Sequence, residues 1–191
     1  MSNHPSKQPK PIMSEKKVLC LLNDGVEETE LVAPVDILRR AGVEVTIAAM
    51  QELTVTSKEG LKIGGDVKID EVNIADFDAL MIPGGPAVME LLEDGRAGNL
   101  AKQFALAGKT VAAICAAPLI LDQVGLLEGK RFTCYESCKQ QLANALDERV
   151  VIDGELITSC GPGTALDFGF AIAQHLCGKA KATQVIEEMM A

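Results

Sequence analysis

The stretch Thr110-Val-Ala-Ala-Ile-Cys115-Ala-Ala-Pro118 passes from a short apolar run directly into a helical pattern. Such a short run, bounded by β-branched residues, is typical of a buried strand in a parallel sheet. Proline suits the first turn of a helix, because the N–H that it lacks would have no partner there in any case. The stretch therefore predicts a strand that ends at Cys115 and a helix that begins just after it.

This position gives the thiol of Cys115 two alternative roles. At the N-terminus of a helix, unpaired amides and the positive end of the helix dipole favour thiolate over thiol, which makes a cysteine a nucleophile. A cysteine in an apolar strand can equally be buried and inert, since free cysteine is among the most buried residue types. The spacing alone leaves both roles open.

From residue 17 onward, strand patterns alternate with helix patterns, which is typical of a parallel sheet covered by helices. Hairpins are expected through Val55 and 61–63, and over 149–158 with a turn at Asp153-Gly154. The other strands are expected at 18–22, 44–49, 79–83, 110–115 and 131–133, and the helices at 27–41, 96–107, from Pro118, at 163–176 and from Lys181 onward.

The domain organisation follows from length and composition. The 191 residues suffice for one well-buried α/β domain and are too few for two ordinary ones, so we expect a single domain over 17–191. Residues 1–16 are polar, proline-rich and without periodicity, and they predict a disordered N-terminal lead in which Met13 is as good a start as Met1.

Composition also bears on partners and compartment. The net charge of −9 and the absence of tryptophan argue against nucleic-acid partners, and the charge argues against anionic membranes. No apolar run approaches the roughly 18 residues of a membrane span, and the N-terminus has no apolar signal core, so we expect a cytoplasmic location. The six cysteines lie within strand or helix patterns and are expected to be reduced thiols.

Three predicted strands end at segments suited to a ligand site. In doubly wound sheets, ligands bind beyond the carboxyl ends of the strands, which here lead into Asn23-Asp-Gly25, Pro83-Gly84-Gly85 and Cys115. The glycine pair lets the backbone turn its amides into a cleft, and together with the amide of Ala116 it could form an oxyanion hole for an adduct at Cys115. Alternatively, Pro83-Gly84-Gly85 is merely a turn.

The expected activating partner of Cys115 is a carboxyl group. The two histidines, His4 and His175, lie in the predicted lead and inside the last apolar helix. Glu27 and Glu28 fit helix capping and solvent exposure. Glu30 lies about one turn further along, where burial would raise its pKa and let a protonated carboxyl donate to a thiolate.

Other motifs give weaker signals. Cys134 and Cys138 have a spacing that suits zinc only with two further ligands, which the sequence does not supply, so no metal site is expected. The loop Gly161-Pro-Gly-Thr164 could bind an anion at the start of the following helix, although a glycine-rich loop alone is weak support.

Taken together, several segments resemble the ThiJ/PfpI superfamily, and within it the branch of the Parkinson-associated protein deglycase and bacterial YajL. The resemblance runs from about Lys17 to Lys179 and implies a flavodoxin-like three-layer sandwich, a homodimer, Cys115 as nucleophile, protonated Glu30 as its partner, and oxyanion amides from Gly85 and Ala116. The segments are Gly25-Val-Glu-Glu-Thr-Glu30, Arg39-Arg-Ala-Gly42, Ile82-Pro-Gly-Gly85, Ala112-Ala-Ile-Cys-Ala-Ala-Pro118 and Thr158-Ser-Cys-Gly-Pro-Gly-Thr164.

The chain departs from the family pattern at three positions. Ala116 stands where protease-like members have histidine, which argues against peptidase activity. Tyr135 replaces a histidine near the site of some relatives; it can donate a hydrogen bond but is no base near neutrality. Cys160 replaces a frequent arginine, so an anion contact is lost, and a thiol close to Cys115 could resolve a sulfenic acid there into a disulfide.

The resemblance implies chemistry on reactive dicarbonyls such as methylglyoxal, or on their early adducts with amino groups, with no cofactor or metal. An alternative is a redox-responsive stress protein or chaperone in which Cys115 is oxidised. A third possibility is a role in thiazole monophosphate biosynthesis, for which no dedicated phosphate site is evident beyond the Gly161 loop.

Overall fold

The computed structural model describes residues 16–191, so the predicted N-terminal lead lies outside the described residues except for Lys16. Seven strands form one sheet in the order β5-β2-β1-β6-β7-β9-β8. All neighbours pair in parallel except β8 and β9, which form the predicted hairpin with Gly154 in the left-handed region. The strands are β1 (Lys17–Leu22), β2 (Glu44–Ala49), β5 (Val67–Lys68), β6 (Ala79–Ile82), β7 (Thr110–Ile114), β8 (Val150–Asp153) and β9 (Leu156–Ser159).

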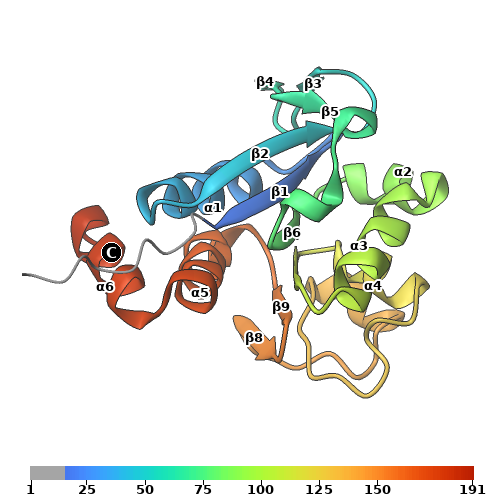
Figure 1. The fold of residues 1–191 in the computed structure, drawn as a ribbon. Helices are drawn as coiled ribbons and strands as arrows, with labels where there is room; N and C mark the ends of the chain where they lie inside the picture. Colours follow the sequence, from blue (N-terminus) through green and yellow to red (C-terminus); the bar gives the residue numbers. More distant parts are fainter. Residues whose placement is uncertain (1–15) are drawn as a thin grey trace, which may run out of the picture.

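Helices cover both faces of this sheet (Figure 1), which confirms the flavodoxin-like three-layer architecture. Helices α1, α5 and α6 pack on one face, and α2, α3 and α4 pack on the other. The helices are α1 (Glu28–Arg40), α2 (Ala87–Asp94), α3 (Arg96–Leu106), α4 (Pro118–Gln123), α5 (Ala165–Cys177) and α6 (Lys179–Met189), with 3-10 turns at Ile69–Glu71, Ile74–Asp76, Glu136–Gln140 and Pro162–Thr164.

The buried side chains of β1 show how the sheet forms two cores. Val18, Cys20 and Leu22 contribute to the core beneath α1 and α5, whereas Leu19 and Leu21 contribute to the core beneath α2, α3 and α4. A strand covered on both faces needs apolar residues at every position, which is why β1 has no polar alternation. The predicted hairpin around Val55 is also confirmed, as β3 (Thr54–Thr56) and β4 (Lys62–Gly64).

Two expectations differ from the structure. The strand predicted at 131–133 is wrong, because the Thr133 amide donates to the side-chain Oγ1 of Thr158 at 2.9 Å and Thr133 Oγ1 donates to the Leu146 carbonyl, in place of a backbone ladder. Helix α2 was not expected. It is short and is followed at once by α3, with Gly95 in the left-handed region as the joint.

No helix within residues 16–191 is both long and apolar enough to cross a membrane.

Helices α1 and α5 cross closely at Gly169. A Cβ at this position would lie 2.7 Å from Ile37 Cδ1 and 2.9 Å from the backbone Cα of Pro34. Gly169→Ala is therefore expected to lower the free energy of unfolding by about 1–2 kcal/mol, because overpacking outweighs the better helix propensity of alanine. Urea unfolding measures the change. Gly64→Ala, where no atom lies within 4 Å, is the control, and an equal loss there would contradict this account.

Candidate active site

Three loops meet at one edge of the sheet. Strands β1, β6 and β7 are parallel neighbours, so the loops that follow them emerge side by side. These loops carry Gly25, the Gly84-Gly85 pair and Cys115. The structure thus brings together the segments that the sequence predicts at the ligand-binding edge.

Cys115 occupies a strained turn directly after β7. Its φ is 65°, and Met190 is the other non-glycine residue with a positive φ in the described part of the chain. Its amide donates to the Ser159 carbonyl at 2.9 Å, and its carbonyl accepts from the Tyr135 amide at 2.8 Å. A left-handed conformation costs a side-chain-bearing residue about 1–3 kcal/mol and is common at active sites. This strain supports a functional role for the thiol.

Glu30 is fully buried in the first turn of α1. Its Oε2 accepts from the Gly84 amide at 2.9 Å. Its Oε1 has no hydrogen-bond partner within residues 16–191. Among the neighbouring side chains, the thiol of Cys115 has the largest effect on the pKa of this carboxyl, which it lowers. A buried carboxyl with a single donor favours its neutral, proton-bearing form.

Gly84 allows the carboxyl and the thiol to meet. A Cβ on Gly84 would lie 2.5 Å from Glu30 Oε2 and 2.6 Å from Cys115 Cβ. Any larger residue at this position would separate the two groups or displace the loop. A glycine is thus required here by close packing between the loop, the helix and the strand end.

The two pKa values define the charge of the pair. Burial raises the pKa of Glu30 to about 7. Burial, followed by the charge of ionised Glu30, raises the pKa of Cys115 to about 12, while backbone hydrogen bonds from Gly85 and Ala116 lower it. Ionisation of both groups at once is therefore unfavourable. The Cys115 thiol loses its proton more readily while Glu30 is protonated.

The helix-terminus prediction for Cys115 is wrong in one respect. A lowered thiol pKa was expected from the following helix, but α4 has only six residues and burial dominates. The amides that stabilise negative charge on sulfur are instead those of Gly85 and Ala116, the two predicted as oxyanion donors.

Glu27 and Glu28 differ from the expected pair of exposed capping residues. Glu27 is the N-cap of α1, with Oε2 accepting from the Glu30 amide at 2.9 Å, but it is only 7% exposed. Glu28 is half-buried and faces the β3–β4 hairpin, where it accepts from the Glu59 amide at 3.4 Å. Sequence reasoning missed the burial of Glu27, since capping patterns carry no information about what covers the helix end.

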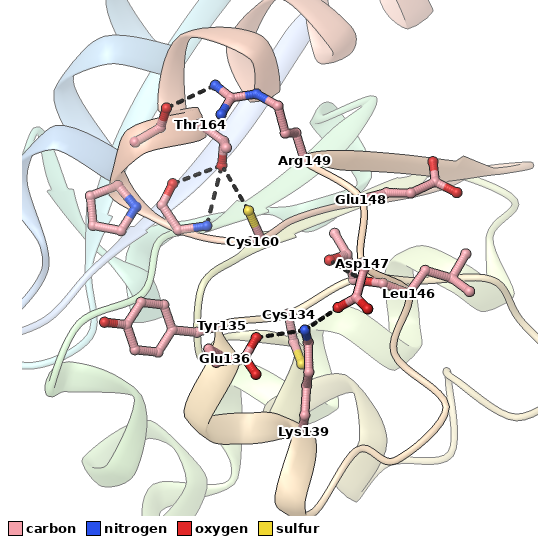
Figure 2. A pocket seen from close by; sticks show the side chains of 14 residues that line it. Cys134, Tyr135, Glu136, Lys139, Leu146, Asp147, Glu148, Arg149, Cys160 and Thr164 are labelled. Atoms are coloured by element: carbon pink, nitrogen blue, oxygen red, sulfur yellow. Dashed lines mark hydrogen bonds and ion pairs between the residues drawn. The ribbon is translucent and has the colours of Figure 1, made fainter.

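A cavity of about 480 Å³ lies between the segment 133–139 and the loop that follows β9 (Figure 2), and neither Cys115 nor Glu30 lines it. Tyr135 and Cys160 line it, and the Tyr135 ring packs against Gly161, where a Cβ would lie 3.1 Å from Cδ2. Lys139 forms ion pairs with Glu136 and Asp147 across one side of the cavity. Of the two residues predicted to neighbour the site, Tyr135 contacts Cys115 through its backbone, since its amide donates to the Cys115 carbonyl at 2.8 Å.

Arg149 is a residue that the sequence analysis did not identify. Its guanidinium donates to the Gly163 carbonyl at 3.0 Å and pairs with Asp167, so a cation contacts the loop that follows Cys160. Its distance in sequence from that loop explains why no motif indicated it.

Cys160 and Cys115 have different surroundings. Cys160 Sγ lies 3.7 Å from Thr164 Oγ1 and lines the cavity, whereas the Cys115 thiol faces Glu30, Gly85 and Ala116. Both cysteines are free thiols. The arrangement gives no support to Cys160 as a resolving thiol.

The two histidines and the possible metal ligands are the remaining candidates. His175 bonds Glu155 at 2.9 Å, at the start of β9 and so at the end opposite Cys160. His4 falls outside the described residues. Between residues 16 and 191, no group of three or more histidine, cysteine or acidic side chains is placed to hold a metal ion.

The raised pKa of Glu30 predicts a pH-dependent cost to stability. In the unfolded chain this carboxyl has its ordinary pKa of 4.5, and in the fold its pKa is about 7, so stability falls as pH rises between the two. Glu30→Gln removes that cost. Its free energy of unfolding is expected to gain about 3 kcal/mol on the parent between about pH 4 and about pH 8. Urea unfolding at both pH values tests this, with exposed Glu93→Gln as control; parallel pH dependences of parent and Glu30→Gln would refute it.

Comparisons with known proteins agree with this geometry. The family model described as DJ-1/PfpI family matches residues 16–175. Protein dj-1beta of Drosophila melanogaster is 38% identical over 92% of this chain and 97% of its own length, and its crystal structure superposes with a TM-score of 0.88 over 93% of this chain and 98% of that one.

Two further relatives are named for an activity. The glutathione-independent glyoxalase DJR-1.2 of Caenorhabditis elegans is 34% identical over 92% of this chain and 97% of its own length. Deglycase PfpI of Pyrococcus furiosus is 36% identical over 77% of this chain and 91% of its own length. By sequence and by fold, this chain belongs to the DJ-1/PfpI family.

Proposed function

We propose that this protein is a cysteine-dependent glyoxalase or deglycase that acts on reactive dicarbonyls or on their early adducts with amino groups, in stress protection. The observation that carries the proposal is the fully buried Glu30 carboxyl beside Cys115 on its strained turn, and burial raises the pKa of Glu30 to about 7. The activities in the names of two relatives support the same chemistry.

The first step is addition of the thiolate to the aldehyde. Cys115 Sγ forms a bond to the aldehyde carbon of methylglyoxal, and the carbonyl electron pair moves to oxygen. We assign the stabilisation of this developing charge to the amides of Gly85 and Ala116, whose hydrogen bonds to the Cys115 sulfur support their position beside the reacting atoms. A proton from Glu30 completes the hemithioacetal and leaves Glu30 as a carboxylate, a form suited to act next as a base.

The second stage moves a hydrogen between neighbouring carbons. The Glu30 carboxylate removes the proton from the carbon bonded to sulfur and returns it to the adjacent carbon, while the hydroxyl proton passes from the oxygen on the first carbon to the oxygen on the second. The hemithioacetal thereby becomes a thioester of lactate. Water then adds to the thioester, the carbon–sulfur bond breaks, and lactate leaves while one proton of the water returns to Glu30 and the other passes to solvent, which restores the thiolate and the neutral carboxyl. The sum is addition of one water molecule to methylglyoxal, so no external oxidant or reductant is needed.

Specificity and assembly form part of the proposal. Ala116 offers no side-chain base beside the nucleophile, so we do not assign peptidase activity. The proposed assembly is a homodimer. It is supported by exposed apolar side chains on α1 and on the β3–β4 hairpin, Val32 at 55% and Leu61 at 57%, where the Lys58 amide bonds the Val26 carbonyl and holds the hairpin beside α1.

Lactate formation from methylglyoxal tests the proposed enzyme. Cys115→Ser is expected to abolish turnover, and Glu30→Gln is expected to slow it at least about 100-fold, because Glu30 acts as both acid and base. Glu28→Gln is the matched control, since it makes the same side-chain substitution two residues away on the hairpin side. Equal losses in the two glutamine variants, or turnover by Cys115→Ser, would contradict the assignment.

A redox-responsive function is the second candidate, because the same groups surround one sulfur. The Gly85 and Ala116 amides and the unpartnered Glu30 Oε1 are placed to hold oxygens added to Cys115. Hydrogen peroxide would oxidise the thiolate to sulfenic acid with release of water, and a second equivalent would give sulfinic acid.

Mild peroxide treatment followed by peptide mapping without reduction tests this second candidate. We expect sulfinic acid on Cys115 with Cys160 still a free thiol, because the two side chains have separate surroundings. A Cys115–Cys160 disulfide would instead establish the resolving role. If Cys115 stays reduced while it still forms lactate from methylglyoxal, the redox candidate fails and the enzymatic one stands.

A further inference from the structure

Three hydrogen bonds close a ring at the N-terminus of α1. The Gly84 amide donates to Glu30 Oε2 at 2.9 Å, the Glu27 amide donates to the Gly84 carbonyl at 3.1 Å, and the Glu30 amide donates to Glu27 Oε2 at 2.9 Å. Glu27 contributes both its backbone and its side chain. The ring fastens the first turn of α1 to the loop after β6 and fixes the carboxyl that faces Cys115.

The ring leaves no room for rearrangement on the loop side. A Cβ on Gly85 would lie 2.5 Å from the Glu27 amide nitrogen, so the two backbones are in close contact. Because Glu27 is only 7% exposed, its carboxylate acts on Glu30 with little screening by water. Two carboxyl groups therefore lie in one buried turn, and only one of them, Glu27, has the helix N-terminus to stabilise its charge.

Polar or charged groups on three other segments act on the Glu30 carboxyl. The Cys115 thiol approaches from the end of β7, the Gly84 amide from the loop after β6, and Lys58 from the hairpin loop, where its backbone is bonded to Val26. Ionised Glu27 raises the pKa of Glu30, and Lys58 lowers it. The lysine side chain is 46% exposed, so its effect is the more screened of the two.

We propose that Glu27 is a positioning residue of the site: its buried carboxylate caps α1 through the Glu30 amide and keeps the Glu30 carboxyl neutral and aimed at Cys115. The use to which that proton is put rests on the proposed function, but the positioning itself does not. A capping residue with a purely structural role would hold the helix turn without setting the protonation of its neighbour.

Titration of Glu30 by carbon-13 NMR of labelled glutamate carboxyls tests the proposal without any turnover. The Glu30 signal is assigned by its loss in Glu30→Gln, and each titration is repeated with Cys115→Ser to remove the coupled thiol. Glu27→Gln retains an oxygen that can accept from the Glu30 amide but carries no charge. Its Glu30 midpoint is expected about one pH unit below the parent value. Glu27→Asp keeps both charge and cap and is expected to stay near the parent.

Matched controls separate this effect from a general change of charge. Glu28→Gln is expected to leave the midpoint unchanged, and Lys58→Gln is expected to raise it. If Glu27→Gln fails to fold, Glu27→Ser supplies an uncharged cap for the same measurement. Equal midpoints in parent and uncharged variant, or equal shifts in Glu27→Gln and Glu28→Gln, would overturn the proposal. Loss of the proposed function would appear separately, as absence of lactate formation with the Glu30 midpoints still displaced.

Discussion

The buried carboxyl of Glu30 beside the thiol of Cys115 is the interaction around which this end of the molecule is arranged. One donor, the Gly84 amide, reaches the carboxyl, and the other oxygen is unpartnered within the described residues. A carboxylate in such a place is costly, so the group keeps its proton near neutrality and destabilises the fold when it loses that proton. A residue selected only for stability at this buried position would be apolar.

The backbone conformation near Cys115 and Gly84 lets the thiol and the carboxyl lie close together. Cys115 has a left-handed backbone conformation, and the strand β7 ends there. Gly84 has no side chain, so the Glu30 carboxyl and Cys115 can both lie against it. Parallel pairing of β1, β6 and β7 determines where these segments meet. Strain and burial are thus concentrated at one sheet edge, while the cores on both faces are ordinary apolar packing.

The sequence predicted the parts of this arrangement that depend on local pattern. Three features each indicate one local conformation: the short run before Cys115, the glycine pair after β6, and Pro118 at the start of a helix. The fold class followed from the alternation of strand and helix patterns along the chain. The strand at 131–133 failed because its amide partner is a side chain, Thr158 Oγ1, which no periodicity reveals. Local patterns do not encode three other features, because these depend on distant segments. They are the burial of Glu27, the contact of Arg149 with the Gly163 carbonyl, and the larger effect of burial than of the helix dipole on the pKa of Cys115.

The two candidate functions use the same groups and differ in what first reaches the sulfur. A thiolate stabilised by two amides and a protonated carboxyl adds to an aldehyde or reacts with peroxide equally well in principle. In the enzymatic route Glu30 must both give and take a proton, which a pKa near 7 allows in each direction. In the redox route the carboxyl only has to donate to added oxygens, for which a much higher pKa would serve as well. Glu27 raises the pKa of this carboxyl and Lys58 lowers it, which suits a group that both gives and takes a proton.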